Sequence, residues 1–125
     1  MKMFEFFKSD NKKDSDQVLK RIDFKDKEQW SYITELSHKQ AVYIFKHSSR
    51  CGISSMVLSR FEKQLKERKA SYFYLHIQGF RSLSNWLAEE LGVRHESPQL
   101  IILKNGKVLA HESHYALLEL AQNYK

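Results

Sequence analysis

The residues best suited to chemistry surround the single cysteine of this chain, Cys51. It follows a short apolar run at 41–45 and precedes apolar residues spaced by three and four, so it stands where a strand gives way to a helix. A cysteine reacts as its thiolate, and the free N–H groups and dipole at a helix N-terminus favour that negative charge. Cys51 is therefore the candidate nucleophile. The alternative, a small apolar core residue, fits its neighbours Arg50 and Gly52 poorly.

Three polar residues near Cys51 could assist it. Arg50 and His47 would bring positive charge or a hydrogen-bond donor close to the thiolate. Ser54 lies three residues after Cys51, on the same face of the expected helix, so its hydroxyl could donate to the thiolate. Ser48 or Ser49 could cap the helix N-terminus.

Other kinds of site have little support in the sequence. His111 and His114 form a pair without a third ligand in reach, so no metal site is expected. There is no Gly-x-Ser-x-Gly sequence and no glycine-rich phosphate loop. The aromatic run at 72–74 could stack on bases, but core packing is the favoured interpretation, and no nucleic-acid partner is expected.

Composition indicates one domain with a core of its own. The chain has 125 residues, of which 42% are hydrophobic and 13% aromatic, enough to fold without disulfides. One cysteine cannot form an internal disulfide, which suggests a reducing, cytoplasmic location. No apolar run approaches the ~20 residues of a membrane span, and the N-terminus does not have the pattern of a signal peptide, so no membrane partner is expected.

The net charge of +6 is concentrated in one stretch. Residues 38–76 hold eight Lys and Arg against two Glu, and the rest of the chain is balanced. A positive electrostatic field of this kind attracts anions of several kinds. The alternative interpretation is a solvent-exposed helix face rich in lysine, which would have the same composition.

The elements that must position Cys51 follow from apolar periodicity. Residues 1–16 are expected to be a flexible lead-in and residues 17–125 the domain, because 8–16 is polar and aperiodic. The pattern predicts strands within 17–24 and over 41–45, 71–77 and 99–103, and helices over 26–38, 53–65, 80–91 and 115–121. Gly92 would end the third helix, and Asn105-Gly106 would join 99–103 to 108–110 as a hairpin. Alternating strands and helices followed by a hairpin predict an α/β fold, with a mixed sheet covered by helices on both faces.

This order resembles the thioredoxin superfamily, and its details resemble the monothiol bacilliredoxins. The residues that carry the resemblance are Phe-Lys-His-Ser-Ser-Arg-Cys-Gly-Ile-Ser at 45–54, Ser-Pro-Gln at 97–99 and Lys-Asn-Gly-Lys at 104–107. The resemblance runs from about residue 20 to the end.

The resemblance implies a thiol–disulfide exchange site. A cis Pro98 would face Cys51, the Ser97 backbone would pair with an extended disulfide substrate, and Gly52 and Ile53 would contribute to substrate binding. Ser54 stands where dithiol relatives carry a resolving cysteine. With one thiol, the enzyme would take a small thiol from a protein mixed disulfide and need an external thiol for release.

Family membership would make that small thiol bacillithiol, acting as a co-substrate, with no bound cofactor. Its malate carboxylates suit the basic surroundings of Cys51. The expected partners are bacillithiolated client proteins, and the sequence does not indicate an oligomeric state.

Two alternatives remain open at the level of sequence. The tetrad at 51–54 is similar to the Cys-Gly-Phe-Ser of monothiol glutaredoxins, which bind glutathione and iron–sulfur clusters, but Val108–His111 stands where those proteins carry a Gly-Gly pair. The third interpretation is a thioredoxin-fold binding module that uses the 38–76 stretch as its interface.

Overall fold

A mixed sheet of five strands brings the Cys51 segment to one of its ends. The computed structural model describes residues 19–124, so the expected lead-in at 1–16 and the start of the domain at 17 lie outside the described residues. The elements, in chain order, are β1 (Lys20–Asp23), the 3-10 helix η1 (Lys27–Gln29), α2 (Trp30–Ser37), β2 (Val42–His47), α3 (Gly52–Glu67), β3 (Ser71–His76), α4 (Arg81–Leu91), β4 (Gln99–Lys104), β5 (Lys107–Ser113) and α5 (Ala116–Asn123).

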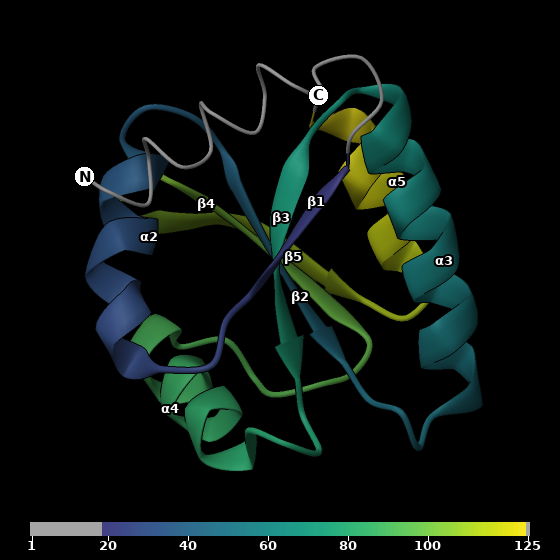
Figure 1. Cartoon of the computed structure of the whole chain (residues 1–125), viewed down its shortest axis with the longest axis horizontal. Coiled ribbons are helices and arrows are strands. Elements are labelled where there is room, and N and C mark those ends of the chain that lie inside the picture. The colour runs from purple at the N-terminus through teal and green to yellow at the C-terminus, as the bar shows by residue number, and fades with distance from the viewer. Residues whose placement is uncertain (1–18, 125) are drawn as a thin grey trace.

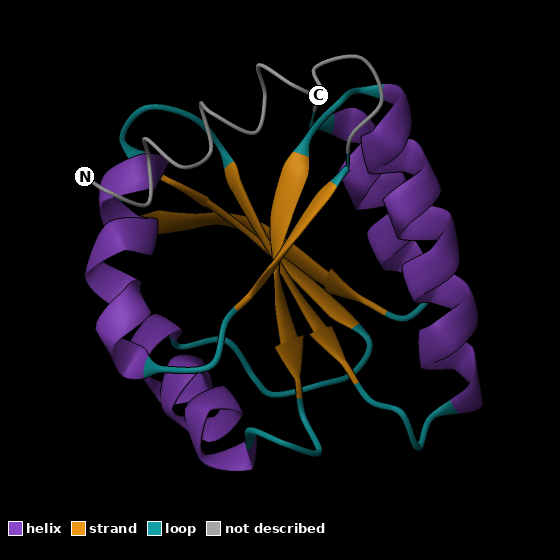
Figure 2. Cartoon of the chain, viewed as in Figure 1, coloured by secondary structure: helices purple, strands orange, loops and turns teal. Residues whose placement is uncertain are grey.

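The strand order is β1-β3-β2-β4-β5. β1, β3 and β2 are parallel, whereas β4 is antiparallel to both β2 and β5. The predicted α/β class, with a mixed sheet and a C-terminal hairpin, is therefore confirmed. Helices α2 and α4 cover one face and α3 and α5 the other (Figures 1 and 2).

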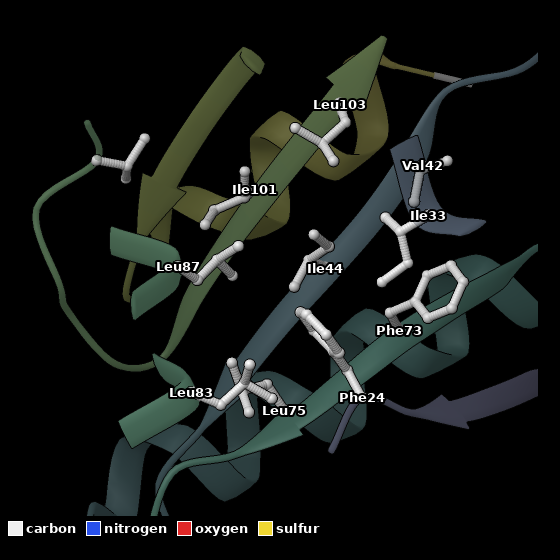
Figure 3. Packing of buried hydrophobic residues seen from close by; sticks show 11 residues of the cluster. Phe24, Ile33, Val42, Ile44, Phe73, Leu75, Leu83, Leu87, Ile101 and Leu103 are labelled. Carbon is white, nitrogen blue, oxygen red and sulfur yellow. The ribbon is translucent and has the colours of Figure 1, made fainter. Parts of the chain in front are cut away.

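Two hydrophobic clusters, one on each face of the sheet, hold the layers together. Neighbouring residues of a strand point to opposite faces, so in β2 Ile44 packs toward α2 and α4 while Phe45 packs toward α3 and α5. In Figure 3, Ile44 and Ile101 of adjacent strands lie on the same side as Leu87 of α4. Because both faces of β2 are covered, all six of its residues are buried.

β2 ends two residues past the end of its apolar run, at His47 instead of 45. Lys46 and His47 continue the strand because they pair with Leu75 and His76 of β3, and Lys46 also pairs with Gln99 of β4. Both polar side chains are consequently buried, Lys46 completely. Tertiary pairing here overrides the local hydropathy pattern.

The predicted hairpin is present, and β5 is longer than expected. Asn105 and Gly106 have φ of 55° and 76°, the positive values that a two-residue turn of this kind requires. β5 continues to Ser113, past the expected end at 110, since its register with β4 runs as far as Gln99.

The parallel strands β2 and β3 end at paired positions, because His47 is the register partner of His76. The β2–α3 and β3–α4 connections therefore leave the same end of the sheet, which is the lower end in Figure 1. Gln99 opposite Lys46 brings the segment before β4 to this end as well. This end of the sheet gathers Cys51, the start of α4 and Pro98.

Candidate active site

Cys51 is the N-cap residue of α3. Its backbone is extended, with φ −104° and ψ 116°, and no side chain caps the helix, so the prediction that Ser48 or Ser49 would do so is wrong. The Cys51 N–H donates to the Ser48 carbonyl at 3.3 Å, which closes a turn just before the helix. The thiol is partly exposed. The placement combines access for a substrate with the N-terminal end of a sixteen-residue helix.

Ser54 is fully buried, and its hydroxyl links α3 to the end of β2. The Ser48 N–H donates to Ser54 Oγ at 3.1 Å, and Ser54 Oγ lies 2.8 Å from His47 Nδ1. Both contacts join Ser54 Oγ to the end of β2. Among the described residues no hydrogen bond joins Ser54 Oγ to the Cys51 thiol, and the expected donation to the thiolate stays a prediction.

His47 has an environment that keeps it neutral. Burial lowers its pKa, and the nearby charges of His76 and Arg21 lower it further. The ring stacks against Tyr74 and His76, each with centroids at 5.8 Å. His47 thus serves as a hydrogen-bond partner of Ser54 rather than as a positive charge for the thiolate.

Gln78, which the sequence did not single out, forms hydrogen bonds with Ser48 and Ser49, just before Cys51. Its Oε1 accepts from the Ser49 N–H at 2.9 Å and from the Ser49 hydroxyl at 3.2 Å. Its Nε2 donates to Ser48 Oγ at 2.8 Å, and Ser48 Oγ also accepts from the Arg50 N–H. No sequence signal could have identified Gln78, because a lone glutamine in a turn acquires this role only when β3 ends beside β2.

Arg50 is exposed and faces the start of α4. Together with Ile77, Gln78 and Arg81 it lines an open pocket of about 250 Å³. Among the described residues, none forms a hydrogen bond with the Cys51 thiol. Arg50, His47 and Ser54 lie around the 47–54 segment, but none of the three is hydrogen-bonded to the sulfur.

Pro98 stands at the same sheet end, immediately before β4. The Ser97–Pro98 peptide bond is cis, Pro98 is buried, and Ser97 is partly exposed. The Pro98 carbonyl accepts from the His114 N–H at 2.9 Å. His114 has φ 58°, a left-handed conformation that favours glycine.

The position of His114 corrects one detail of the sequence comparison. Val108–His111, matched above to the Gly-Gly pair of monothiol glutaredoxins, lies inside β5. The segment that actually follows the hairpin is His114-Tyr115, and it is the part of the chain bonded to Pro98.

The first turns of α3 expose apolar surface next to Cys51. Gly52 is open, with nothing within 4 Å of the position of a Cβ. Ile53 is 37% and Met56 44% exposed, and Tyr115, 49% exposed, donates its hydroxyl to Met56 Sδ at 3.9 Å. Exposed large apolar side chains gathered near a reactive group are typical of a surface that contacts a protein substrate.

The described residues provide neither a cluster of metal ligands nor a membrane-spanning helix. Within residues 19–124 no group of three or more His, Cys, Asp or Glu side chains could hold a metal ion. None of the helices in that range has the length and hydropathy to cross a bilayer.

Comparison with known proteins gives one family and one fold. The family model described as monothiol bacilliredoxin BrxC matches residues 22–120. A solved candidate oxidoreductase with a thioredoxin fold is 31% identical, with a TM-score of 0.72 over 82% of this chain and 93% of that chain. Thioredoxins from Schistosoma mansoni and Nicotiana alata superpose with TM-scores of 0.67 and 0.66 at 14% and 15% identity. Those two matches cover 84% and 87% of this chain and 93% and 96% of theirs, and they show the fold alone.

Proposed function

Because this chain belongs to the monothiol bacilliredoxin family and is a thiol–disulfide oxidoreductase, we propose that Cys51 removes bacillithiol from protein mixed disulfides. The observation that carries the proposal is the place of the single cysteine, partly exposed at the N-terminus of α3. Three residues further on, where a resolving cysteine would stand, the chain has the buried Ser54.

In the first step the Cys51 thiolate attacks the bacillithiol sulfur of a client mixed disulfide. A bond forms between Cys51 Sγ and that sulfur as the original S–S bond breaks. The client thiolate leaves and takes a proton from solvent. The client cysteine is thereby reduced, and Cys51 becomes oxidised as its own mixed disulfide.

In the second step an external thiol restores Cys51. Ser54 cannot attack a disulfide, so the adduct waits for a second bacillithiol thiolate or a reductase. When bacillithiol attacks the bound bacillithiol sulfur, Cys51 leaves as the thiolate and bacillithiol disulfide is the product. The electrons come from thiols throughout, so the cycle needs no bound cofactor.

The residues around Cys51 would each assist this exchange in a different way. The N-terminus of α3 stabilises the thiolate both as attacking and as leaving group. The cis Pro98 segment would offer the Ser97 backbone to an extended substrate, and Gly52 and Ile53 would contribute to its binding. Ile53, Met56 and Tyr115 give the client an apolar surface to rest on. The partners are bacillithiolated proteins, and a reducing compartment such as the cytoplasm is where such a thiol stays active.

The test follows bacillithiol from a modified client to this protein by intact-mass spectrometry. The wild type is expected to acquire the bacillithiol mass as the client loses it, and Cys51→Ser to do neither. A matched control moves the thiol along the helix, in the double variant C51S/S55C, because Ser55 is exposed on α3 but away from its N-terminus. It is expected to react slowly.

Two results would contradict the proposal. Transfer to the Cys51→Ser variant would exclude Cys51 as the nucleophile. Equally rapid transfer from the same client carrying glutathione would exclude bacillithiol as the preferred thiol and favour the glutaredoxin-like alternative.

A further inference from the structure

An open pocket that includes Arg50, the residue preceding Cys51, is lined by two exposed arginines. It is bounded by Arg50, Ile77, Gln78 and Arg81 and holds about 250 Å³. Both arginines are exposed, and no carboxylate among residues 19–124 forms an ion pair with either. The pocket therefore offers positive charge that the described part of the protein does not itself neutralise.

The residues on one side of this pocket are held in place by hydrogen bonds within the protein. The Gln78 carboxamide is held by Ser48 and Ser49 through three hydrogen bonds, and the Arg50 N–H bonds Ser48 Oγ at 3.3 Å. Arg81 is the first residue of α4, a regular eleven-residue helix. Pre-ordered backbone at both arginines lowers the entropy cost of binding a small anion.

More positive charge lies behind the pocket. Lys46 is completely buried, and its Nζ donates to the Ser84 carbonyl of α4 at 3.2 Å. Burial and the charge of Arg81 lower the pKa of Lys46 to about 8, so it remains mostly protonated at pH 7. Burial, Lys46 and Arg81 lower the pKa of His95, and the carboxylate of Glu96 acts on it in the opposite direction. The cluster keeps a net positive charge.

The first turn of α4 adds to this field. Its N-cap residue, Phe80, makes no side-chain cap, and the first turn has no acidic residue. The positive end of the helix dipole and the Arg81 guanidinium therefore face the same small space.

The chemistry of the pocket matches a small dicarboxylate. A guanidinium fork pairs with a carboxylate through two parallel hydrogen bonds, and two forks can take two carboxylates. The volume is below the ~300–1,000 Å³ of pockets for drug-sized ligands, so it suits one end of a molecule.

We infer that this pocket binds the malate-like end of the small thiol whose sulfur Cys51 takes, with Arg50 and Arg81 pairing with its carboxylates. The inference rests on the proposed function and adds Arg81 as a specificity-determining residue. Gln78 acts as a positioning residue, because it holds the backbone that carries Arg50.

The test compares two thiols on one model client. The client cysteine carries either bacillithiol or bacillithiol with its carboxylates blocked as methyl esters, and transfer to Cys51 is timed by intact mass. The variant is Arg81→Gln. The matched control is Arg60→Gln, which removes the same charge from an exposed position of α3 outside the pocket.

The wild type is expected to take bacillithiol about tenfold or more faster than the ester, since a charged hydrogen bond is worth about 1.5–3 kcal/mol. Arg81→Gln should slow transfer of bacillithiol toward the rate of the ester, because only Arg50 still pairs with a carboxylate, and should leave the ester unaffected. Arg60→Gln should behave as the wild type. Equal rates for both thiols in the wild type, or equal slowing of both by Arg81→Gln, would overturn the inference while leaving the thiol exchange intact. A wild type that takes neither thiol would overturn the proposed function and the inference together.

Discussion

The hydroxyl of Ser54 joins the helix of Cys51 to the strand before it. It accepts from the Ser48 N–H and shares a hydrogen bond with His47 Nδ1. In a dithiol relative this position would be reactive, whereas here it is a buried structural contact. The orientation of the Cys51 segment therefore depends on a group that takes no part in the chemistry.

Replacing Ser54 with alanine should cost stability because two buried partners lose their hydrogen bond. We expect Ser54→Ala to lower the free energy of unfolding by about 1–3 kcal/mol. Urea denaturation measures this, with Ser55→Ala, at an exposed position of the same helix, as the control. Equal stability of the two variants would show that the Ser54 contacts contribute nothing.

Lys46 is a buried charge, and no carboxylate among residues 19–124 forms an ion pair with it. Its ordinary pKa is 10.5 and the folded value is about 8, so between these pH values the unfolded chain binds more protons than the folded one. Stability contributed through Lys46 should therefore rise with pH across this window, by up to roughly 3 kcal/mol.

A variant without the amine isolates this contribution. Relative to Lys46→Met, the wild type should gain stability as the pH rises from 8 to 10.5. Comparing the two proteins at each pH removes the effect of tyrosines such as Tyr74, whose pKa burial raises. Lys66→Met, at an exposed position of α3, is the matched control and should follow the wild type. Parallel curves for the wild type and Lys46→Met would contradict the prediction.

Single residues were predictable from sequence where their chemistry is local. Cys51 could be placed at a strand-to-helix junction because the apolar spacing changes on either side of it. Gln78, Arg81 and Lys46 could not be linked to it, since their roles depend on which strand ends lie side by side. For the same reason the contacts of Ser54 Oγ with Ser48 and His47 could not be predicted.

At the scale of elements, two glycines differ in backbone conformation: one needs a positive φ and the other does not. Gly92 ends α4 in the left-handed region, with φ 66°. Gly52 opens α3 with an ordinary helical backbone and nothing within 4 Å of a Cβ. The same substitution should therefore have opposite effects at the two sites.

We expect Gly92→Ala to destabilise the protein by about 1–2 kcal/mol and Gly52→Ala to stabilise it by about 0.4–1 kcal/mol. Thermal unfolding of both variants checks the sign. Destabilisation by both would show that the α3 N-terminus requires glycine for another reason.

Element types were predictable, and their ends were less so. The Asn105-Gly106 turn and the Gly92 stop were found correctly because each depends on a local φ preference. The helix expected from residue 26 instead begins as the 3-10 turn η1, with Asp26 and Gln29 forming a capping box, and continues as α2. Strands β2 and β5 run past their apolar cores because pairing with neighbours, not hydropathy, sets where they stop.

At the scale of the whole molecule, the sheet topology divides the basic stretch at 38–76 into unlike parts. Lys46 is buried in β2, Arg50 faces the pocket, and residues such as Arg60 and Lys63 lie on the exposed face of α3. The alternation of strands and helices predicted the layers, but strand order is a long-range property, and no local pattern specifies that β2 lies between β3 and β4.

The central place of β2 has a consequence for how the chain is made. During synthesis from the N-terminus, β1, β2 and β3 can pair as soon as they emerge, but the second edge of β2 stays open until β4 follows. Every residue of β2 is buried in the finished sheet, so this nascent edge exposes unpaired backbone N–H and C=O groups beside apolar side chains, and it can pair with another copy.

A chain that stops at residue 97 should therefore form sedimentable aggregates, and a peptide of residues 98–125 supplied in trans should restore solubility. A soluble, monomeric 1–97 chain would contradict this. The hairpin of β4 and β5 thus covers the open edge of β2 in the nascent chain. A ribosome-bound chaperone would be most useful before this hairpin has been synthesised.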